Sequence, residues 1–257
     1  AFGGVALKDG RYYGLPTGKQ HMVLYYNKAK FDTWNEQNPA EQIPYPSSDW
    51  DNPSTFTEIR DYAKKLSSGT GALRSFGLSA GPFLAYAGMY AVNSGGENIF
   101  DANGNSVIKS EPFYTTYKWF DDMLKTDKSM PSPSDTATAS SIDRFLNGNI
   151  AMNIDGIWQL ADIVKYTSFP VGIAAIPVLN KGMKAHSTAF VDRFFAVRTS
   201  KNHEADQIAL EYLMHAESIH ALAKERVGGI PIYTEAIDTY MEALVDSKIG
   251  DYIESIT

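Results

Sequence analysis

The sequence predicts an α/β fold, because apolar residues recur first at helical and then at strand spacing along most of the chain. The clearest case is the stretch 140–160. Its first part puts Ile142 and Phe145 on one face of a short helix, and residues 147–149 end that helix with side chains that tolerate a left-handed backbone. Residues 150–155 then alternate between apolar and small or polar side chains, which indicates a strand with one polar face. Strands that alternate with helices favour a mostly parallel sheet.

Other elements are predicted from caps, prolines and the same two spacings. Thr55 and Glu58 form a capping box, and Pro112 is placed to begin another helix. Residues 31–49 and 130–138 are rich in proline and polar side chains, so we expect loops there. The other expected helices are 82–92, 113–124, 204–224 and 234–245, and the other expected strands are 22–26, 75–79, 171–176 and 189–197.

Composition narrows the function. The 257 residues include 23 Lys and Arg against 30 Asp and Glu, with no basic run, which argues against a nucleic-acid surface. The absence of cysteine excludes disulfides, zinc–thiolate sites and thiol catalysis. No apolar run approaches the roughly 20 residues of a membrane-spanning helix. The five histidines lack the paired spacing of a metal site, so neither a metal nor a cofactor is expected.

One short motif suggests an enzyme. Residues 77–81, Gly-Leu-Ser-Ala-Gly, match the elbow in which a hydrolase holds its nucleophilic serine on a strained turn, here Ser79. An acid such as Asp155 or Asp192 and a histidine from the C-terminal helices could complete a Ser-Asp-His set. Pro82 follows closely, however, and a plain strand-to-helix turn explains the same residues. A serine esterase of the α/β-hydrolase type is therefore the alternative function.

An indole follows the polar-faced strand. Asp155 and Gly156 end that strand, and Trp158 comes directly after them, at the carboxyl edge where open α/β sheets place their ligands. Trp158 is either part of the core or a surface on which a ligand stacks. With 4 Trp, 15 Tyr and 13 Phe, the chain has aromatic rings beyond the needs of a core. Aromatic rings beside Asp, Asn, Gln and Arg suit a sugar, which has an apolar face and a rim of hydroxyl groups.

Three stretches of the chain resemble one protein family, the family 1 extracellular solute-binding proteins. These are the sugar-binding subunits of ABC importers related to maltose-binding protein. Residues 12–28 are similar to the segment in which that family crosses from its first lobe to its second, and residues 196–224 to the helix pair after the return crossing. The residues that match the family signature are Phe145, Gly148, Ala151, Met152, Gly156 and Trp158.

The resemblance implies a periplasmic-binding-protein type II-like fold that is incomplete, with mainly the C-terminal lobe and part of the N-terminal lobe. Residues 1–21 would be the hinge crossover and a remnant of the first lobe, and residues 22–189 the ligand-binding second lobe. Residues 190–238 would be the return crossover with first-lobe helices, and 239–257 a truncated helical segment that returns to the second lobe. Family members begin with an export signal, which this chain does not show, so we expect a fragment.

The implied function is binding without covalent chemistry, so no enzyme activity is expected. A sugar or oligosaccharide, or another small polar solute, would be bound between two lobes and delivered to the transmembrane subunits of an ABC permease. Strands 12–20 and 190–196 would form the hinge. The protein would be a lipoprotein on the extracellular face of the membrane or would lie in the periplasm. A fragment with half of the clamp is expected to bind sugar weakly.

The candidate ligand-binding residues come from the residues themselves and from the resemblance. Trp158 aligns with the stacking tryptophan of the maltose-binding type, and Phe83 with its cleft tyrosine, although Phe83 lacks the hydroxyl group. Asp155 lies at a strand end. Asp192 and Arg193 interrupt an apolar strand, where they are either a polar pair for the ligand or part of an interlobe salt bridge. Residues on or just before strands that border the presumed cleft complete the set: Gln20, His21 and His186.

Overall fold

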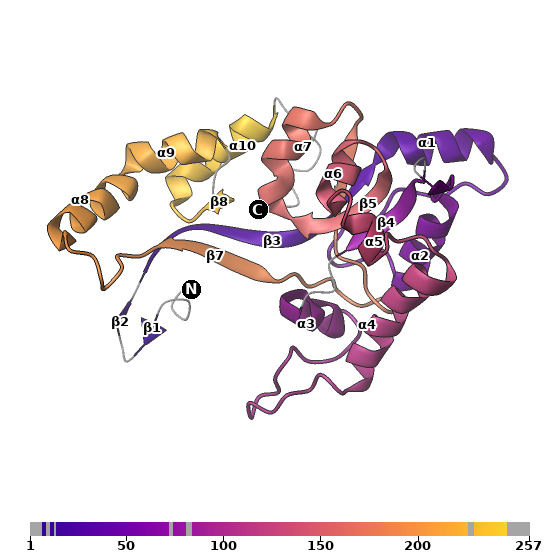
Figure 1. Ribbon diagram of the computed structural model, residues 1–257, viewed down its shortest axis with the longest axis horizontal. Helices are drawn as coiled ribbons and strands as arrows, with labels where there is room; N and C mark the ends of the chain where they lie inside the picture. Colours follow the sequence, from indigo (N-terminus) through magenta and orange to yellow (C-terminus); the bar gives the residue numbers. More distant parts are fainter. Residues whose placement is uncertain are drawn as a thin grey trace. The chain divides into compact units, whose positions relative to one another are not determined.

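The computed structural model describes residues 7–8, 11–12, 14–71, 74–80, 84–225 and 229–245, and this part of the chain divides into two units. The first unit takes its residues from the N-terminal part up to His21 and from Ala189 onward, and the second runs from Met22 to Thr188. Strand β3 (Leu15–Asn27) contributes to both units: its first half pairs with strands of the first, and its second half with strands of the second (Figure 1).

The sheet of the second unit has the strand order β4–β5–β3–β6. Strands β4 (Phe76–Ala80) and β5 (Ile150–Gly156) run parallel, whereas β3 runs antiparallel to both β5 and β6 (Val171–Ala174). The prediction of a mostly parallel sheet is therefore wrong. Residue spacing shows that a strand has two faces, but not its direction, which depends on how the chain enters the sheet. The strands expected at 22–26, 75–79 and 171–176 are confirmed in position.

The described part of the second unit contains nine short helical segments. Helix α2 packs against β4, and α6 packs against β5. The helical segments are α1 (Lys28–Gln37), α2 (Phe56–Lys65), α3 (Leu84–Val92), α4 (Glu111–Asp121), the π-helix η2 (Asp122–Thr126), α5 (Pro133–Thr136), α6 (Ser141–Leu146), the 3-10 helix η3 (Ile157–Gln159) and α7 (Leu160–Tyr166).

Helix α1 occupies part of the segment 31–49 that was expected to be a loop, and that expectation is wrong for its first residues. The side chain of Asn27 caps the helix by accepting a hydrogen bond from the backbone of Lys30. Phe31 is fully buried and contacts the rings of Tyr26 and Tyr62 edge-on at 5.5 and 6.0 Å between ring centres. One buried aromatic side chain anchors this helix, so the sequence has no apolar stripe to reveal it.

The stretch 140–160 folds as predicted. The side chain of Ser140 accepts a hydrogen bond from the backbone N–H of Asp143 and caps α6. Gly148 adopts a left-handed backbone with φ 73° and turns the chain into β5. Residues 150–154 of β5 are all buried. The expected loop at 130–138 contains one short helix, α5, which Ser132 and Asp135 cap reciprocally.

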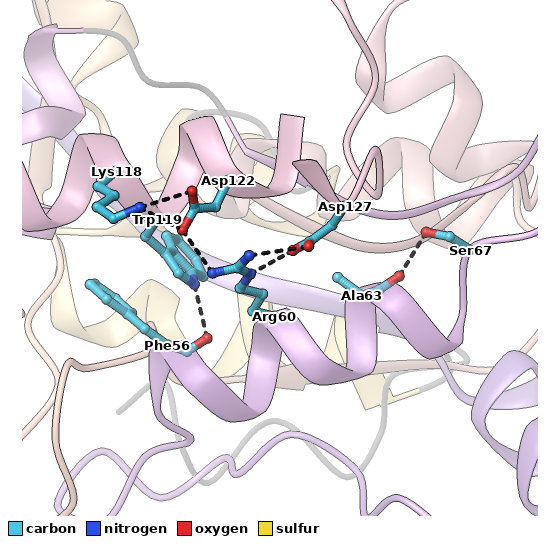
Figure 2. A network of polar contacts seen from close by, with 8 residues as sticks. All are labelled: Phe56, Arg60, Ala63, Ser67, Lys118, Trp119, Asp122 and Asp127. Atoms are coloured by element: carbon cyan, nitrogen blue, oxygen red, sulfur yellow. Dashed lines mark hydrogen bonds and ion pairs between the residues drawn. The ribbon is translucent and has the colours of Figure 1, made fainter. Parts of the chain in front are cut away.

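A network of polar contacts joins α2 to the end of α4 (Figure 2). Thr55 and Glu58 form the predicted capping box at the start of α2. Arg60 donates hydrogen bonds to Asp122, at 2.8 Å, and to Asp127. Both aspartates belong to the π-helical turn, in which the backbone N–H of Asp127 donates to the carbonyl of Asp122 at 2.8 Å.

The first unit consists of strand pairs and helices. Strands β7 (Ala189–Phe194) and β8 (Ile230–Pro231) both pair antiparallel with β3. The remaining elements are β1 (Leu7–Lys8), β2 (Arg11–Tyr12), α8 (His203–Leu213), α9 (Ala216–Lys224), the 3-10 helix η4 (Thr234–Ala236) and α10 (Ile237–Val245). Helix α10 packs on α9. Residues 246–257 lie outside the described residues, and the four-part division of the chain stays a prediction. None of the described helices has the length and apolar character needed to cross a bilayer.

Candidate functional site

A cavity of about 550 Å³ lies beside the carboxyl ends of β4 and β5 in the second unit. These two strands are parallel, so they end at the same edge of the sheet, where ligands of α/β proteins are usually bound. The described residues that line the cavity are Met22, Ser79, Ala80, Tyr86, Phe120, Leu124, Met130, Pro131, Pro133, Thr136, Ser140, Ser141, Ile142, Asn153, Ile154 and Asp155.

One wall of the cavity is the polar face of the two parallel strands. Ser79 lies opposite Asn153 in the strand register, and Asp155 follows two residues later on the same face. Ser79 and Asn153 are only 3% and 1% exposed. The amide nitrogen of Asn153 makes no hydrogen bond of normal geometry to any described residue. Buried polar groups are nearly always hydrogen bonded, so this donor stands out from the rest of the core.

The carboxylate of Asp155 is held at the end of β5. Its Oδ1 accepts a hydrogen bond from the backbone N–H of Gly156 at 2.8 Å, and its Oδ2 accepts one from Gln159 at 3.1 Å. Burial raises the pKa of this carboxyl group, and the two hydrogen bonds together with the neighbouring Asn153 amide counteract the rise. Burial and the charge of Asp155 also raise the pKa of Tyr86. The polar wall therefore combines a buried amide donor with a carboxylate acceptor.

The rest of the lining is largely apolar. Phe120 comes from α4, Leu124 from the π-helix, and Met130 from the segment that follows. The π-helical turn that carries Leu124 is the one whose aspartates bind Arg60 (Figure 2), so this ion-pair network holds the apolar wall to α2. A polar wall and an apolar wall together suit a ligand that has both kinds of surface.

Over residues 1–247 the chain matches the family described as bacterial extracellular solute-binding protein. The chain belongs to this family. It is 25% identical over 236 residues to a putative binding protein of Brucella abortus. This match covers 88% of this chain and 52% of that protein. It is also 25% identical over 252 residues to the maltooligosaccharide ABC transporter solute-binding lipoprotein of Streptococcus pneumoniae, covering 90% of this chain and 52% of the relative.

The chain thus spans about half the length of these curated relatives. A solved structure of an ABC substrate-binding protein from Listeria monocytogenes, in complex with cycloalternan, matches with a TM-score of 0.79 at 22% identity. The match covers 98% of this chain and 61% of that one. The resemblance seen in the sequence is confirmed, and so is a periplasmic-binding-protein type II-like α/β fold, of which the chain covers a part.

Trp158 lies in η3, directly after β5, and is half-buried. Its indole packs closely against Gly156: a methyl group added to that glycine would lie 2.0 Å from the ring. The hydroxyl group of Tyr25 donates to the carbonyl of Gly156 at 2.9 Å and supports the same strand end. Trp158 is not enclosed in the core, and it does not line the described cavity. Its role as a stacking surface stays a prediction.

Two more candidates come from the second unit. Phe83 lies outside the described residues. His186 is exposed, and its backbone N–H donates to the Asn93 side chain at 2.8 Å. Of the predicted residues in this unit, Asp155 is the one that the described cavity contains.

Four candidates belong to the first unit. The side chain of Gln20, 8% exposed, donates a hydrogen bond to Asp192 across the β3–β7 pair. Arg193 is exposed, and its guanidinium lies 5.6 Å from the centre of the Phe195 ring. Burial, and then the charge of Lys19, lower the pKa of His21 to about 4, so His21 is neutral at neutral pH. Asp192 and Arg193 line a smaller cavity of about 240 Å³, with apolar residues of α9.

The serine of the elbow-like motif is not on a turn. Ser79 is the fourth residue of the five-residue strand β4, and its backbone is in register with Asn153 of β5. No histidine is among the described residues that line the cavity with Ser79. A nucleophile elbow needs an exposed serine at a strand-to-helix turn and a histidine beside it, and this arrangement provides neither. In the part of the chain that the structure describes, no group of acidic or histidine side chains is placed to hold a metal ion.

Sequence reasoning missed most of the cavity. Asn153 could have been found, because the alternation of residues 150–155 already placed it on the same polar face as Asp155. The elbow-like motif indicates Ser79 only as a nucleophile. The apolar wall carries no signal of its own in the sequence, since Phe120 and Leu124 have the spacing of any buried helix face.

Proposed function

We propose that this protein is the solute-binding component of an ABC importer, and that it binds a sugar or oligosaccharide and delivers it to a membrane permease. The observation that carries the proposal is the cavity at the carboxyl ends of β4 and β5, in a chain of the solute-binding family. Its polar wall offers hydrogen bonds to hydroxyl groups, and its apolar wall offers contact to the C–H face of a sugar ring.

Relatives support this assignment by their names. One is a maltooligosaccharide ABC transporter solute-binding lipoprotein, and another is an ABC substrate-binding protein in complex with cycloalternan. By analogy the protein acts outside the cytoplasmic membrane, as a lipoprotein or in the periplasm, and its partners are the permease subunits. Binding is the whole task of such a component, so no bond of the solute is broken.

Trp158 is proposed to stack on the solute beside the cavity. It follows the strand that carries Asp155, it is only half-buried, and its indole packs so closely on Gly156 that a side chain there would have no room. Solute binding would favour closure of two lobes, with β3 and β7 as the hinge strands. Closure of this kind is a population shift, driven by contacts that exist only in the closed form.

The proposal is tested by thermal melting of the full-length protein in the presence of single sugars. A ligand at 100 times its dissociation constant adds about 2.7 kcal/mol to the stability of the folded state, which gives a measurable rise in Tm. We expect such a rise with at least one neutral sugar. The rise should be reduced in Trp158→Ala and kept in Trp34→Ala. Trp34 is a half-buried tryptophan on α1, and its indole N–H donates to the carbonyl of Glu41 at 3.2 Å. A rise with amino acids or peptides and with no sugar would contradict the proposal.

A further inference from the structure

The amide of Asn153 marks a place where a ligand group fits. Asn153 is 99% buried, its side chain lines the cavity, and its nitrogen makes no normal hydrogen bond to the described residues. The other fully buried asparagine of this unit, Asn93, shows the contrast. The Asn93 amide nitrogen donates to the carbonyls of Met89 and His186, at 2.9 and 2.8 Å. A buried donor without a hydrogen bond is costly unless an acceptor reaches it. A ligand acceptor could reach the Asn153 amide from the cavity.

An acceptor lies next to this donor. Asp155 faces the same cavity two residues further along β5, and each of its oxygens accepts one hydrogen bond from the protein. A carboxylate can accept about four hydrogen bonds, so it retains capacity for ligand hydroxyl groups. Ser79 stands beside Asn153 on the neighbouring strand and adds a hydroxyl group to the same wall. A donor and an acceptor side by side match a sugar hydroxyl, which gives one hydrogen bond and receives another.

The charge of the cavity separates neutral from acidic solutes. Asp155 is the one carboxylic acid in the described lining, and the same lining contains no Lys, Arg or His. An anionic ligand would therefore be buried next to a carboxylate without a counter-ion, which is strongly unfavourable. The first turn of α6 also lines the cavity, but it carries its own carboxylate, Asp143, hydrogen bonded to the Ser140 hydroxyl. The positive end of that helix is thus already matched by an acidic side chain.

We propose that this cavity binds one neutral sugar ring, that Asn153 and Asp155 hydrogen bond to its hydroxyl groups, and that the site rejects uronic acids and phosphorylated sugars. Phe120, Leu124 and Met130 then cover the apolar side of the ring. This inference rests on the proposed function and narrows it, because an ABC importer for polar solutes could equally serve acidic sugars or phosphate esters.

The test is isothermal calorimetry on the full-length protein at neutral pH. The neutral probes are glucose, galactose, mannose, arabinose, maltose and maltotriose, and the acidic probes are glucuronic acid, galacturonic acid and glucose 6-phosphate. We expect a neutral probe to bind at least about 100-fold more tightly than any acidic probe, because a buried like-charge contact costs more than a lost hydrogen bond. Equal or tighter binding of an acidic probe overturns the inference and leaves the proposed sugar-binding function standing. Failure of every sugar overturns both.

Two variants test whether the cavity causes the preference for neutral over acidic sugars. Asp155→Asn keeps the shape of the side chain and removes its charge, so we expect the ratio of neutral to acidic affinity to fall by at least about tenfold. Asp162→Asn is the matched control, because Asp162 is an exposed residue of α7 with the same charge and does not line the cavity. The ratio should not change in this control. An equal ratio in the two variants would mean that the general negative charge of the protein, and not the cavity, causes the selectivity.

A third variant tests the donor. Asn153→Leu replaces the amide by an apolar group of similar size, and we expect the affinity for the neutral sugar to fall by at least about tenfold. Cooperative thermal unfolding of each variant shows that the loss does not come from misfolding. If a folded Asn153→Leu protein binds the sugar as tightly as the parent, Asn153 is not a ligand contact and the inference is wrong.

Discussion

Two hollows formed by the described residues of the second unit differ in how their polar groups are used. A groove of about 700 Å³ runs along α2 and α4, and three of its charged side chains are bonded to each other, because Arg60 and Lys118 both donate to Asp122. The cavity of about 550 Å³ at β4 and β5 is smaller, yet its amide donor, Asn153, has no normal partner in the described protein. Size alone would select the groove. Unused hydrogen-bonding capacity selects the cavity, and this is the better guide to a binding site.

The comparison predicts the largest difference for two buried asparagines. Asn93→Leu removes three hydrogen bonds at 2.8 to 2.9 Å and leaves a carbonyl and an N–H of His186 without their partner. We expect it to lower the free energy of unfolding by about 3 kcal/mol. Asn153→Leu should lower that free energy by less than about 1 kcal/mol, since the Asn153 amide makes no normal hydrogen bond and only its favourable interaction with the Asp155 carboxylate is lost.

Urea unfolding of the two variants gives the measurement. The slope of free energy against urea should be the same in both, which shows that the variants unfold over the same surface. If Asn153→Leu costs as much as Asn93→Leu, the Asn153 amide stabilises the fold, and the distinction between the groove and the cavity is lost.

Arg60→Ala should have the next largest effect. We expect this variant to lower the free energy of unfolding and to change the affinity for the sugar only slightly. Removing one partner of a buried ion pair leaves the other charge unpaired, which costs 3–5 kcal/mol when both groups are fully buried. The side chains of Arg60 and Asp127 are 28% and 9% exposed, so we expect a loss of about 2 kcal/mol. Calorimetric affinity for the neutral sugar should change less than it does in Asn153→Leu.

The control for this variant is Lys125→Ala, which removes an ion pair with Asp121 on the surface of the same helical segment. The side chains of that pair are 71% and 53% exposed, and such pairs contribute less than about 0.5 kcal/mol. Similar melting temperatures for Arg60→Ala and Lys125→Ala would show that the groove network has no special structural role.

The smallest expected effect is a pH dependence with opposite signs in the two hollows. Burial raises the pKa of Asp155, so its contribution to stability is present below its ordinary pKa of 3.8 and is lost as the pH rises through the raised value. The hydrogen bond from Lys118, and then the charge of Arg60, lower the pKa of Asp122 in the groove. Its contribution is present above 3.8 and is lost as the pH falls through the lowered value.

Urea unfolding at several pH values between 3 and 7 would measure both contributions as differences from the parent protein. Asp155→Asn should gain stability relative to the parent as the pH rises, and Asp122→Asn should lose it. Slopes of the same sign in the two variants would show that burial does not dominate the titration of Asp155.

Elements with a local chemical signature could be predicted from the sequence. The capping box of Thr55 and Glu58, the left-handed turn at Gly148 and the polar face of β5 all depend on residues within one turn or strand. The same reasoning failed where a single long-range contact decides. The polar composition of residues 31–49 predicts a loop, but helix α1 extends into this segment because its one buried anchor, Phe31, packs on rings from β3 and α2.

Helix α4 shows how precisely residue spacing predicts the buried face of a helix. Helical spacing predicts an apolar side made of Phe113, Tyr117 and Phe120, but Tyr117 is 44% exposed. Trp119 takes the buried position, because its ring stacks on Phe56 at 4.4 Å and its indole N–H donates to the Phe56 carbonyl at 2.8 Å. Spacing identifies an apolar face to within one residue, and the partner helix decides which aromatic side chain is buried.

The sequence by itself determined the family, the alternation of helices and strands, and one polar residue of the cavity, Asp155, because these depend on short patterns. The tertiary structure decided that Ser79 and Asn153 stand side by side and that the protein leaves the Asn153 amide unsatisfied. Whether a buried polar group is satisfied depends on which distant side chains arrive next to it, and residues close in the chain carry no information about that.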